Sequence, residues 1–304
     1  MDTYDVCIAW DWEYDECFII LLHQSLAEKG LSVLEVTPDT ISDMYSSLEN
    51  GAISFSSLVD RASDTSPEFI PLHQWAASKN IFRINPRENA SKTWNKARMH
   101  ILISPHGIDT PATILLPSYE DEPGISTYNI ASLGNPFIIK PAHGGGGEGV
   151  LRHASTWNEV TVERQRFPDD QYLLQENIIP LEFTDGPGWF RVLYCDGNVY
   201  PCWWDTETHV YSMVTPAQEK ELRLKPLREI TRIIAGLSGL DMFSTEIAVT
   251  VDNRFVIVDY VNDQVDLRPQ STAHDGVPDI ILNDIVATLA RRVAGVISRN
   301  KQGK

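Results

Sequence analysis

The first 37 residues contain two short apolar runs separated by a longer amphipathic stretch. YDVCIAW (4–10) and LSVLEVT (31–37) each predict a buried strand. ECFIILLHQSLAEKG (16–30) has apolar positions at helical spacing, with Gly30 where a helix is expected to stop. This order of strand, helix and strand predicts the start of an open α/β domain, in which ligands bind at the carboxyl ends of strands.

Three acidic residues, Asp11, Glu13 and Asp15, follow the first predicted strand at such an end. In this position they could recognise the ammonium group of a substrate. A charge run after a strand is more often a solvated turn, so the pattern leaves both interpretations open.

The pattern changes between residues 50 and 117. A polar segment, RASDTSPEF (61–69), precedes the amphipathic PLHQWAASKN (71–80) and a predicted strand, IFRIN (81–85). We place a domain boundary near residue 92. After it, NKARMHILISPHG (95–107) predicts a helix that ends at Gly107, and TPATILLP (110–117) predicts a strand.

The second half of the chain combines strand pairs with long helices. YLLQENIIP (172–180) predicts a strand, and WFRVLYCDGNVYPCWW (189–204) predicts two strands joined at an Asp196-Gly197 turn. EKELRLKPLREITRIIAGLSG (219–239) predicts one long amphipathic helix, and DIILNDIVATLARRVAGVISR (279–299) predicts another. Between them, DMFSTEIAVTVDNRFVIVDYVNDQVDLR (241–268) predicts two alternating strands around Asp252-Asn253.

A glycine-rich segment, PFIIKPAHGGGGEGV (136–150), invites comparison with phosphate-binding loops. Its glycines at 144, 146 and 149 fit G-x-G-x-x-G, but the next helix starts only at Thr156, which has capping-box spacing to Glu159. The delay argues against a Rossmann dehydrogenase, and the missing G-K-[ST] ending excludes a Walker A loop. A strand, glycine loop, strand hairpin that offers backbone N–H groups to phosphates fits better.

Composition narrows the class of protein and of partner. The 304 residues carry a formal net charge of -17, which opposes extended contact with nucleic acid or anionic lipid but allows a small anion in a local basic pocket. No apolar run approaches the roughly 18 to 20 residues that span a bilayer, and the N-terminus lacks a basic signal region, so we expect a cytoplasmic protein. The four cysteines, at positions 7, 17, 195 and 202, are scattered and predict buried free thiols.

Acidic and amide side chains on the predicted strand pair suggest a cation site. Glu246 lies on the first strand, and Asp259 and Asn262 end the second, so three oxygen ligands could surround a hard cation such as Mg²⁺. Two upstream lysines, Lys96 and Lys140, could then meet phosphates that the metal bridges.

The order of these motifs resembles the ATP-grasp superfamily over nearly the whole chain. The motifs are NKARMHILISPHGIDTP, FIIKPAHGGGGEGV, LLQENI, LEFT, FRVLYCDG, STEIAV and DYVN. Within the superfamily, the sequence is most similar to RimK-like and D-alanine:D-alanine ligase-like carboxylate-amine ligases. The resemblance implies an α/β plus α+β fold in which two α+β subdomains (93–177 and 178–304) grip ATP behind an N-terminal α/β domain (1–92) that helps bind substrate.

The resemblance also implies roles for individual residues. Lys96 and Lys140 hold the α- and β-phosphates, and the 144–149 loop with Gly145, Gly146 and Gly147 closes over the β- and γ-phosphates. Glu176 and Ile178 contact adenine through their backbone, and Glu182 contacts the ribose. Glu246, Asp259 and Asn262 bind two Mg²⁺ ions, which Mn²⁺ can replace. Arg191 steadies the γ-phosphate and an acyl phosphate, and Arg268 is a second anion clamp.

The sequence departs from the pattern of the superfamily at the metal site. Asp259 and Asn262 are three residues apart, whereas the usual spacing is two, so Asp263 or Asp266 is an alternative ligand. The position of Glu246 is more often an aspartate. The basic residues also have ordinary interpretations. A lysine on a helix, such as Lys96, is usually a surface residue, and Arg191 could form a cross-strand ion pair. Glu182 could lie in a solvent-facing loop.

The resemblance implies an ATP-dependent ligase that forms a C–N bond through an acyl phosphate and releases ADP and phosphate. The expected substrates are small carboxylates and amines of amino-acid or peptide type, and the assembly could be a homodimer. Two alternatives remain, an ATP-grasp small-molecule kinase and a synapsin-like nucleotide-binding regulatory protein. A kinase of inositol phosphates would need a basic acceptor pocket, which the acidic segment 11–15 does not provide.

Overall fold

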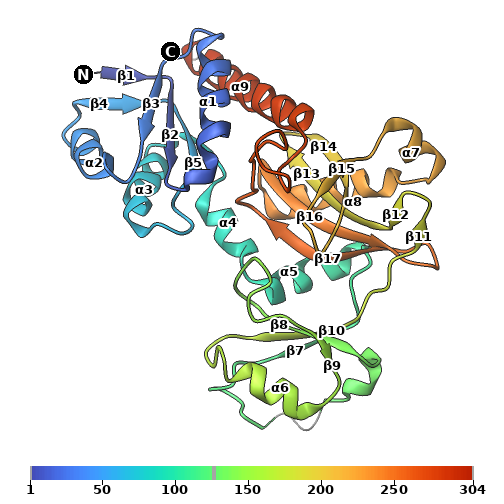
Figure 1. Cartoon of the computed structure of the whole chain (residues 1–304). Coiled ribbons are helices and arrows are strands. Elements are labelled where there is room, and N and C mark those ends of the chain that lie inside the picture. The colour runs from blue at the N-terminus through green and yellow to red at the C-terminus, as the bar shows by residue number, and fades with distance from the viewer. Residues whose placement is uncertain (1, 125–127, 303–304) are drawn as a thin grey trace.

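The computed structural model describes residues 2–124 and 128–302, and the N-terminal part of this chain is a parallel sheet covered on both faces (Figure 1). The sheet has the order β3-β2-β5-β6. Its strands are β2 (Val6–Trp10), β3 (Val33–Val36), β5 (Ser57–Arg61) and β6 (Phe82–Ile84). The connecting segments contain η1 (Glu13–Asp15), α1 (Glu16–Ala27), α2 (Ile41–Glu49), η2 (Pro67–Phe69) and α3 (Ile70–Ser78), and β1 (Asp2–Tyr4) pairs with β4 (Ile53–Phe55).

Strand β2 shows why both faces of this sheet are covered. Val6 and Ile8 pack in the same cluster as α1 and the C-terminal helix α9 (Asp279–Gln302), whereas Cys7 and Ala9 pack with α2 and α3. Because successive residues of a strand point to opposite faces, a strand buried on both sides is a continuous apolar run, as VCIAW is. The predicted open α/β start is confirmed.

A second, antiparallel sheet carries the glycine loop and lies at the bottom of Figure 1. Its order is β7-β10-β8-β9, with β7 (Thr113–Leu116), β8 (Phe137–Pro141), β9 (Leu151–Ala154) and β10 (Tyr172–Glu176). α6 (Trp157–Arg164) covers it and begins with the predicted capping box, and η4 (Ile130–Leu133) precedes β8. Strands β8 and β9 are paired antiparallel, so the predicted strand, glycine loop, strand hairpin is confirmed.

The third large sheet has five antiparallel strands in the order β15-β14-β13-β16-β17. They are β13 (Trp189–Cys195), β14 (Asn198–Trp204), β15 (Tyr211–Met213), β16 (Met242–Val249) and β17 (Phe255–Asn262), and the short strands β11 (Glu182–Phe183) and β12 (Gly186–Pro187) precede them. Helices α4 (Arg87–Thr93), α5 (Lys96–Ile103) and α8 (Lys225–Ser238) share one apolar cluster with this sheet. Helix α5, extended by η3 (Ser104–His106) up to Gly107 as predicted, packs against both β10 and β17.

The sequence prediction failed in two places. The single helix predicted over residues 219–239 is two helices, α7 (Pro216–Glu221) and α8, separated at Arg223, which has a left-handed φ of 55°. Pro226 lies in the first turn of α8, where a backbone N–H has no partner within the helix. Proline is therefore tolerated there, and a new helix begins. Strand β5 was not predicted; it ends at Arg61, where the predicted polar segment 61–69 begins, and its residues SLVDR include buried Ser57, Asp60 and Arg61.

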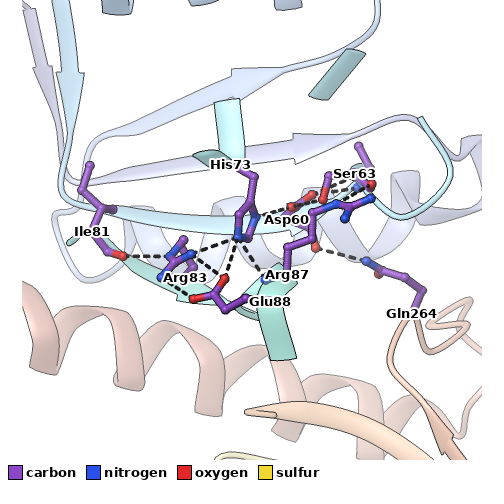
Figure 2. A network of polar contacts seen from close by, with 9 residues as sticks. Asp60, Ser63, His73, Ile81, Arg83, Arg87, Glu88 and Gln264 are labelled. Carbon is purple, nitrogen blue, oxygen red and sulfur yellow. Dashed lines mark hydrogen bonds and ion pairs between the residues drawn. The ribbon is translucent and has the colours of Figure 1, made fainter. Parts of the chain in front are cut away.

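Polar contacts fasten the N-terminal sheet to the loop after β17. Arg61 of β5 donates to both carboxylate oxygens of buried Asp15, at 2.9 and 2.6 Å, and to the carbonyl of Val265 at 2.8 Å. A neighbouring network joins His73 Nδ1 to Asp60 at 2.7 Å, and the Gln264 amide donates to the Asp60 carbonyl at 3.4 Å (Figure 2). These contacts fix the loop that directly follows the predicted metal strand.

The described residues include no helix that is both long and apolar enough to cross a bilayer. The four cysteines are free, as predicted; Cys7, Cys195 and Cys202 are buried as expected, whereas Cys17 is only partly buried. Burial raises the pKa of these three thiols, which keeps them protonated.

We expect Asp15→Asn to destabilise the fold by about 3 to 5 kcal/mol, because it leaves the buried Arg61 guanidinium without its ion-pair partner. Urea unfolding followed by tryptophan fluorescence measures the change. Glu229→Gln removes the exposed Lys225–Glu229 pair of α8 and serves as the matched control, with an expected change below about 0.5 kcal/mol. Equal effects of the two substitutions would contradict the role of the Arg61–Asp15 ion pair in stabilising the fold.

Candidate active site

Three charged residues form a row across the five-stranded sheet. In the strand register Arg191 of β13 lies opposite Glu246 of β16, and Glu246 lies opposite Asp259 of β17. The Arg191 guanidinium donates to Glu246 Oε1 at 3.4 Å, and Trp189 Nε1 donates to Glu246 Oε2, also at 3.4 Å. The cross-strand ion pair considered for Arg191 is therefore present, and it lies beside the residues expected to hold a metal.

The face that carries this row is the one that packs toward α9. Leu193 and Cys195, two and four residues after Arg191, pack in the cluster that contains α9. The opposite face, with Phe190 and Val192, is buried against α8. Arg191 lies on the α9 face, and Cys202, its partner on β14, packs in the cluster of that face, so the row is largely enclosed; the Arg191 and Glu246 side chains are each 17% exposed.

A bulge in β17 brings Asn262 next to Asp259. Two residues of a regular strand that are three positions apart point to opposite faces. Here the register changes between the pairs Ser244–Asn262 and Glu246–Asp259, so β17 accommodates one extra residue over this interval. As a result, the Asn262 amide donates to Asp259 Oδ2 at 3.0 Å, and the unusual spacing still yields adjacent side chains.

A second register change lets Lys140 reach the same strand. Glu246 pairs with Asp259 but Ile247 pairs with Ile257, so the register skips Val258. Lys140, on β8 of the other antiparallel sheet, donates from Nζ to the Val258 carbonyl at 3.0 Å. In a regular ladder the Val258 carbonyl would be paired with the neighbouring strand, whereas here it is free to accept a hydrogen bond from Lys140. Lys140 therefore binds next to Asp259.

The charges of these residues influence one another. Burial, and next the Asp259 carboxylate, raise the pKa of Glu246, while Arg191 and Lys140 oppose the increase. Burial lowers the pKa of Lys140, against the attraction of Asp259 and Glu246. Two cations thus lie among two carboxylates in a partly buried position, an arrangement typical of functional sites.

The donor set fits a small divalent cation. Two carboxylates and an amide oxygen are ligands that Mg²⁺ accepts, and a bound cation would stabilise the ionised form of Glu246, whose pKa is raised chiefly by burial. Within residues 2–124 and 128–302, no three His, Cys, Asp or Glu side chains gather in a metal-binding arrangement, so such a site depends on Asn262 as the third ligand.

The two alternative ligands are each held by a partner of their own. Asp263 is buried and accepts a hydrogen bond from Trp94 Nε1 at 3.1 Å, and it faces Asp64 of the N-terminal region. Asp266 is held by Arg268 at 2.6 to 3.1 Å. Both carboxylates have partners away from Glu246, which favours Asn262.

The glycine loop leaves backbone N–H groups exposed. Gly146 and Gly147 have φ of 61° and 79°, and a Cβ on Gly149 would lie 2.7 Å from the Phe167 ring, so the loop requires glycine. The loop carbonyls of Gly145 and Gly147 accept bonds from Glu148 and Val150. Among the described residues, none accepts a hydrogen bond from the N–H groups of Gly145, Gly146 or Gly147, which makes them available to an anion.

Lys96 lies against the start of this loop. It is the first residue of α5, its backbone N–H donates to the Ala142 carbonyl at 2.7 Å, and its Nζ contacts the Gly144 carbonyl. Lys96 is also close enough to lower the pKa of Lys140. The two predicted phosphate-binding lysines are therefore neighbours.

The predicted adenine and ribose residues follow one another between the two antiparallel sheets. Glu176 ends β10 and its N–H donates to the Ala112 carbonyl at 3.0 Å, and Ile178 lies in the connection that leads to β11. This connection meets β16 where Leu181 N–H donates to the Val249 carbonyl at 2.7 Å. Glu182 is exposed at the start of β11. Their nucleotide roles stay predictions.

Arg268 and the acidic segment 11–15 have partners of their own. Arg268 donates to Asp266 and to Asp275, and its guanidinium lies 5.2 Å from the Tyr14 ring. Asp15 is buried in its pair with Arg61, so it is a structural residue and not an exposed ammonium ligand. Glu13 is exposed, and Asp11 accepts a hydrogen bond from Ser66.

Several side chains at the site carry no motif in the sequence. Ser244 Oγ accepts from Arg191 Nε at 3.2 Å, and the Arg191 guanidinium lies 4.8 Å from the Trp204 ring. Burial alone would lower the pKa of Arg191, but Tyr211 and the carboxylates of Glu246, Asp259 and Asp266 raise it. The odd spacing of Asp259 and Asn262 was the one available signal for the bulge.

Comparison with solved structures identifies the fold. D-alanine–D-alanine ligase from Bacillus anthracis, complexed with ATP, superposes with a TM-score of 0.63 at 14% identity, covering 97% of this chain and 99% of that one. The ATP-grasp ligase PsnB with minimal precursor, Mg and ADP gives 0.64 at 13% identity (97% and 98% covered), and the RimK domain ATP-grasp protein from Sphaerobacter thermophilus gives 0.62 at 19% (94% and 98%).

The chain therefore has the ATP-grasp fold, and the predicted fold class is confirmed. No protein-family model matches the sequence, and a search of curated proteins finds no match. At these identities the comparison establishes the fold alone.

Because Asp64 and Asp263 lie near each other, we expect the stability of the protein to depend on pH through Asp64. Burial, and next the Asp263 carboxylate, raise the pKa of Asp64 to about 6. A carboxyl whose folded pKa is raised costs stability when it is ionised, so Asp64→Asn should stabilise the protein at pH 8 by about 2 kcal/mol. The gain should be largely lost near pH 4, because Asp64 is then protonated in the folded protein.

Urea unfolding at the two pH values measures this difference. Asp39→Asn, at an exposed carboxylate, is the matched control and should change stability at neither pH. A gain for Asp64→Asn that is the same at pH 4 and pH 8 would contradict the electrostatic explanation.

Proposed function

We propose that this chain is an ATP-dependent ligase that joins a carboxylate to an amine through an acyl phosphate and releases ADP and phosphate. The observation that carries the proposal is the charged row Arg191–Glu246–Asp259, completed by Asn262 through the bulge and by Lys140 from the facing sheet. Cations and oxygen ligands meet there within an ATP-grasp fold, next to a loop with free N–H groups.

Each residue takes a role that its surroundings support. Glu246, Asp259 and Asn262 would hold Mg²⁺, which neutralises phosphate charge when bound. Lys96, Lys140 and the N–H groups of the 145–147 loop would bind the phosphates of ATP. Segment 176–182, which connects the two antiparallel sheets, would hold adenine and ribose through Glu176, Ile178 and Glu182.

The proposed reaction has two steps. A carboxylate oxygen of the substrate attacks the γ-phosphorus, the bond to ADP breaks, and an acyl phosphate forms. The amine then attacks the acyl carbon, phosphate leaves, and the amine loses a proton as the amide forms. Arg191 lies next to Glu246 and is suited to stabilise the negative charge that develops on the transferred phosphoryl group.

We propose amino acids and short peptides as the substrate class. One structure with this fold, PsnB, is described as bound to a minimal precursor, and another is a D-alanine–D-alanine ligase. The acidic net charge of -17 fits small substrates better than polyanions.

Incubation with Mg-ATP and pools of amino acids and dipeptides, followed by mass spectrometry, tests the proposal. ADP, free phosphate and a product lighter by one water than its summed substrates are expected. A product heavier by one phosphoryl group would establish a kinase, and tight ATP binding without turnover in every pool would favour a regulatory protein.

Two substitutions should separate nucleotide binding from chemistry. Lys140→Ala should raise the Kd for Mg-ATP by about a hundredfold, because a charged phosphate contact is lost. Asp259→Asn should leave the Kd within about threefold but lower kcat by about 100-fold or more, because a metal charge needed in the transition state is lost. Calorimetry and ADP release measure the two quantities.

Lys225→Ala, at an exposed lysine of α8, is the control and should behave as wild type. Normal ATP affinity in Lys140→Ala would overturn the phosphate assignment. Full turnover in Asp259→Asn would overturn the metal assignment.

A further inference from the structure

One buried tyrosine beside the charged row has no partner for its hydroxyl. Tyr211 of β15 is only 4% exposed, and its carbonyl accepts a hydrogen bond from the Gln270 amide at 3.0 Å. Within residues 2–124 and 128–302, no group forms a hydrogen bond with the Tyr211 hydroxyl, and the hydroxyl oxygen is not fully enclosed by protein atoms. Because buried hydroxyl groups ordinarily have partners, this one is available to a ligand.

The strand register places Tyr211 on the same face of the sheet as Arg191. Arg191 pairs with Cys202 of β14, and Tyr211 pairs with Trp204 of the same strand. Cys202 and Trp204 are two positions apart, so their side chains share one face. The Trp204 ring lies 4.8 Å from the Arg191 guanidinium and 4.6 Å from the Tyr211 ring. Arg191 and Tyr211 are therefore both held against one indole.

The charges indicate that the hydroxyl end of Tyr211 lies toward Arg191. Burial raises the pKa of Tyr211 to about 12, and Arg191 opposes this rise. Burial would lower the pKa of Arg191, and Tyr211 opposes that change more strongly than Glu246 does. Because the charge of an ionised tyrosine resides on its oxygen, these mutual effects place the oxygen near the guanidinium. At neutral pH the hydroxyl is protonated and can donate a hydrogen bond.

The order of residues across the sheet separates Tyr211 from the proposed metal ligands. Asp259, Glu246 and Arg191 lie on β17, β16 and β13, whereas Tyr211 lies on the edge strand β15, beyond Arg191. In an in-line transfer the attacking oxygen approaches the γ-phosphorus from the side opposite ADP. We infer that Tyr211 is a further catalytic residue, whose hydroxyl donates a hydrogen bond to the acyl oxygen of the carboxylate substrate. This inference rests on the proposed function.

The hydrogen bond from Tyr211 would matter most when the amine attacks. As the nitrogen bonds to the acyl carbon, the acyl oxygen takes the electron pair of the C=O bond and becomes an oxyanion. The double bond forms again when phosphate leaves. Tyr211 keeps its proton throughout, and its bond to the oxygen strengthens as negative charge develops there, beside the positive charge of Arg191.

Tyr211→Phe tests the inference, because it removes the hydroxyl and keeps the ring against Trp204. The rate of ADP release at saturating Mg-ATP, in the amino-acid or dipeptide pool that yields a ligated product, should fall about 100-fold, as expected for the loss of one oxyanion donor. The Kd for Mg-ATP, measured by calorimetry, should stay within about twofold, because the lysines and the metal ligands are unchanged. The urea midpoint should equal that of the wild type, because the hydroxyl has no protein partner.

Tyr194→Phe, at a partly buried tyrosine on the opposite face of the same sheet, is the matched control and should behave as wild type in all three measurements. A wild-type rate in Tyr211→Phe would overturn the inference. A slower rate together with a lower urea midpoint or a raised Kd would overturn it too, because the hydroxyl would then act through the fold or the nucleotide. Wild-type protein that forms no ligated product in any pool would instead show that the proposed function is wrong.

Discussion

The structure of the site depends on one irregularity, the bulged pairing of β17 against β16. A regular antiparallel ladder would direct Asp259 and Asn262 to opposite faces and would hide the Val258 carbonyl in the ladder. The extra residues in β17 place Asn262 against Asp259 and leave that carbonyl to Lys140. Without the bulge, the ligands and the lysine would not meet.

The irregular strand is held from both of its faces. Tyr260, which follows Asp259, is buried on the opposite face, where its hydroxyl lies 2.8 Å from His100 of α5 and accepts from Gln175 of β10 at 3.1 Å. Thr245 of β16 donates to the Asp259 carbonyl at 2.9 Å. The Thr245 bond gives the Asp259 carbonyl a partner, and the other two satisfy the Tyr260 hydroxyl, because buried polar groups need partners.

Local sequence patterns were sufficient to predict most helices and strands, but not the features that depend on residues far apart in the sequence. Strand periods, the Thr156–Glu159 capping box and the Asp196-Gly197 turn are each encoded within a few residues, and all were predictable. The break at Arg223 was not, because helical apolar spacing continues through it while the backbone turns left-handed. Strand β5 was missed because its polar residues are satisfied by partners far away in sequence, such as Asp15 for Arg61.

The site shows the same division. Glu246, Asp259, Asn262, Lys96 and Lys140 were identified from residue type and order, and the structure brings them together. Only the three-residue spacing of Asp259 and Asn262 argued against Asn262 as a metal ligand, because no sequence rule reveals where a strand bulges. The balance of charges around Glu246 could not be predicted from the sequence either. Burial and Asp259 raise the pKa of Glu246, and Arg191 and Lys140 offset part of that cost from other strands. A cation bound between the carboxylates would take over this compensation, and Arg191 would then be free to face an anion.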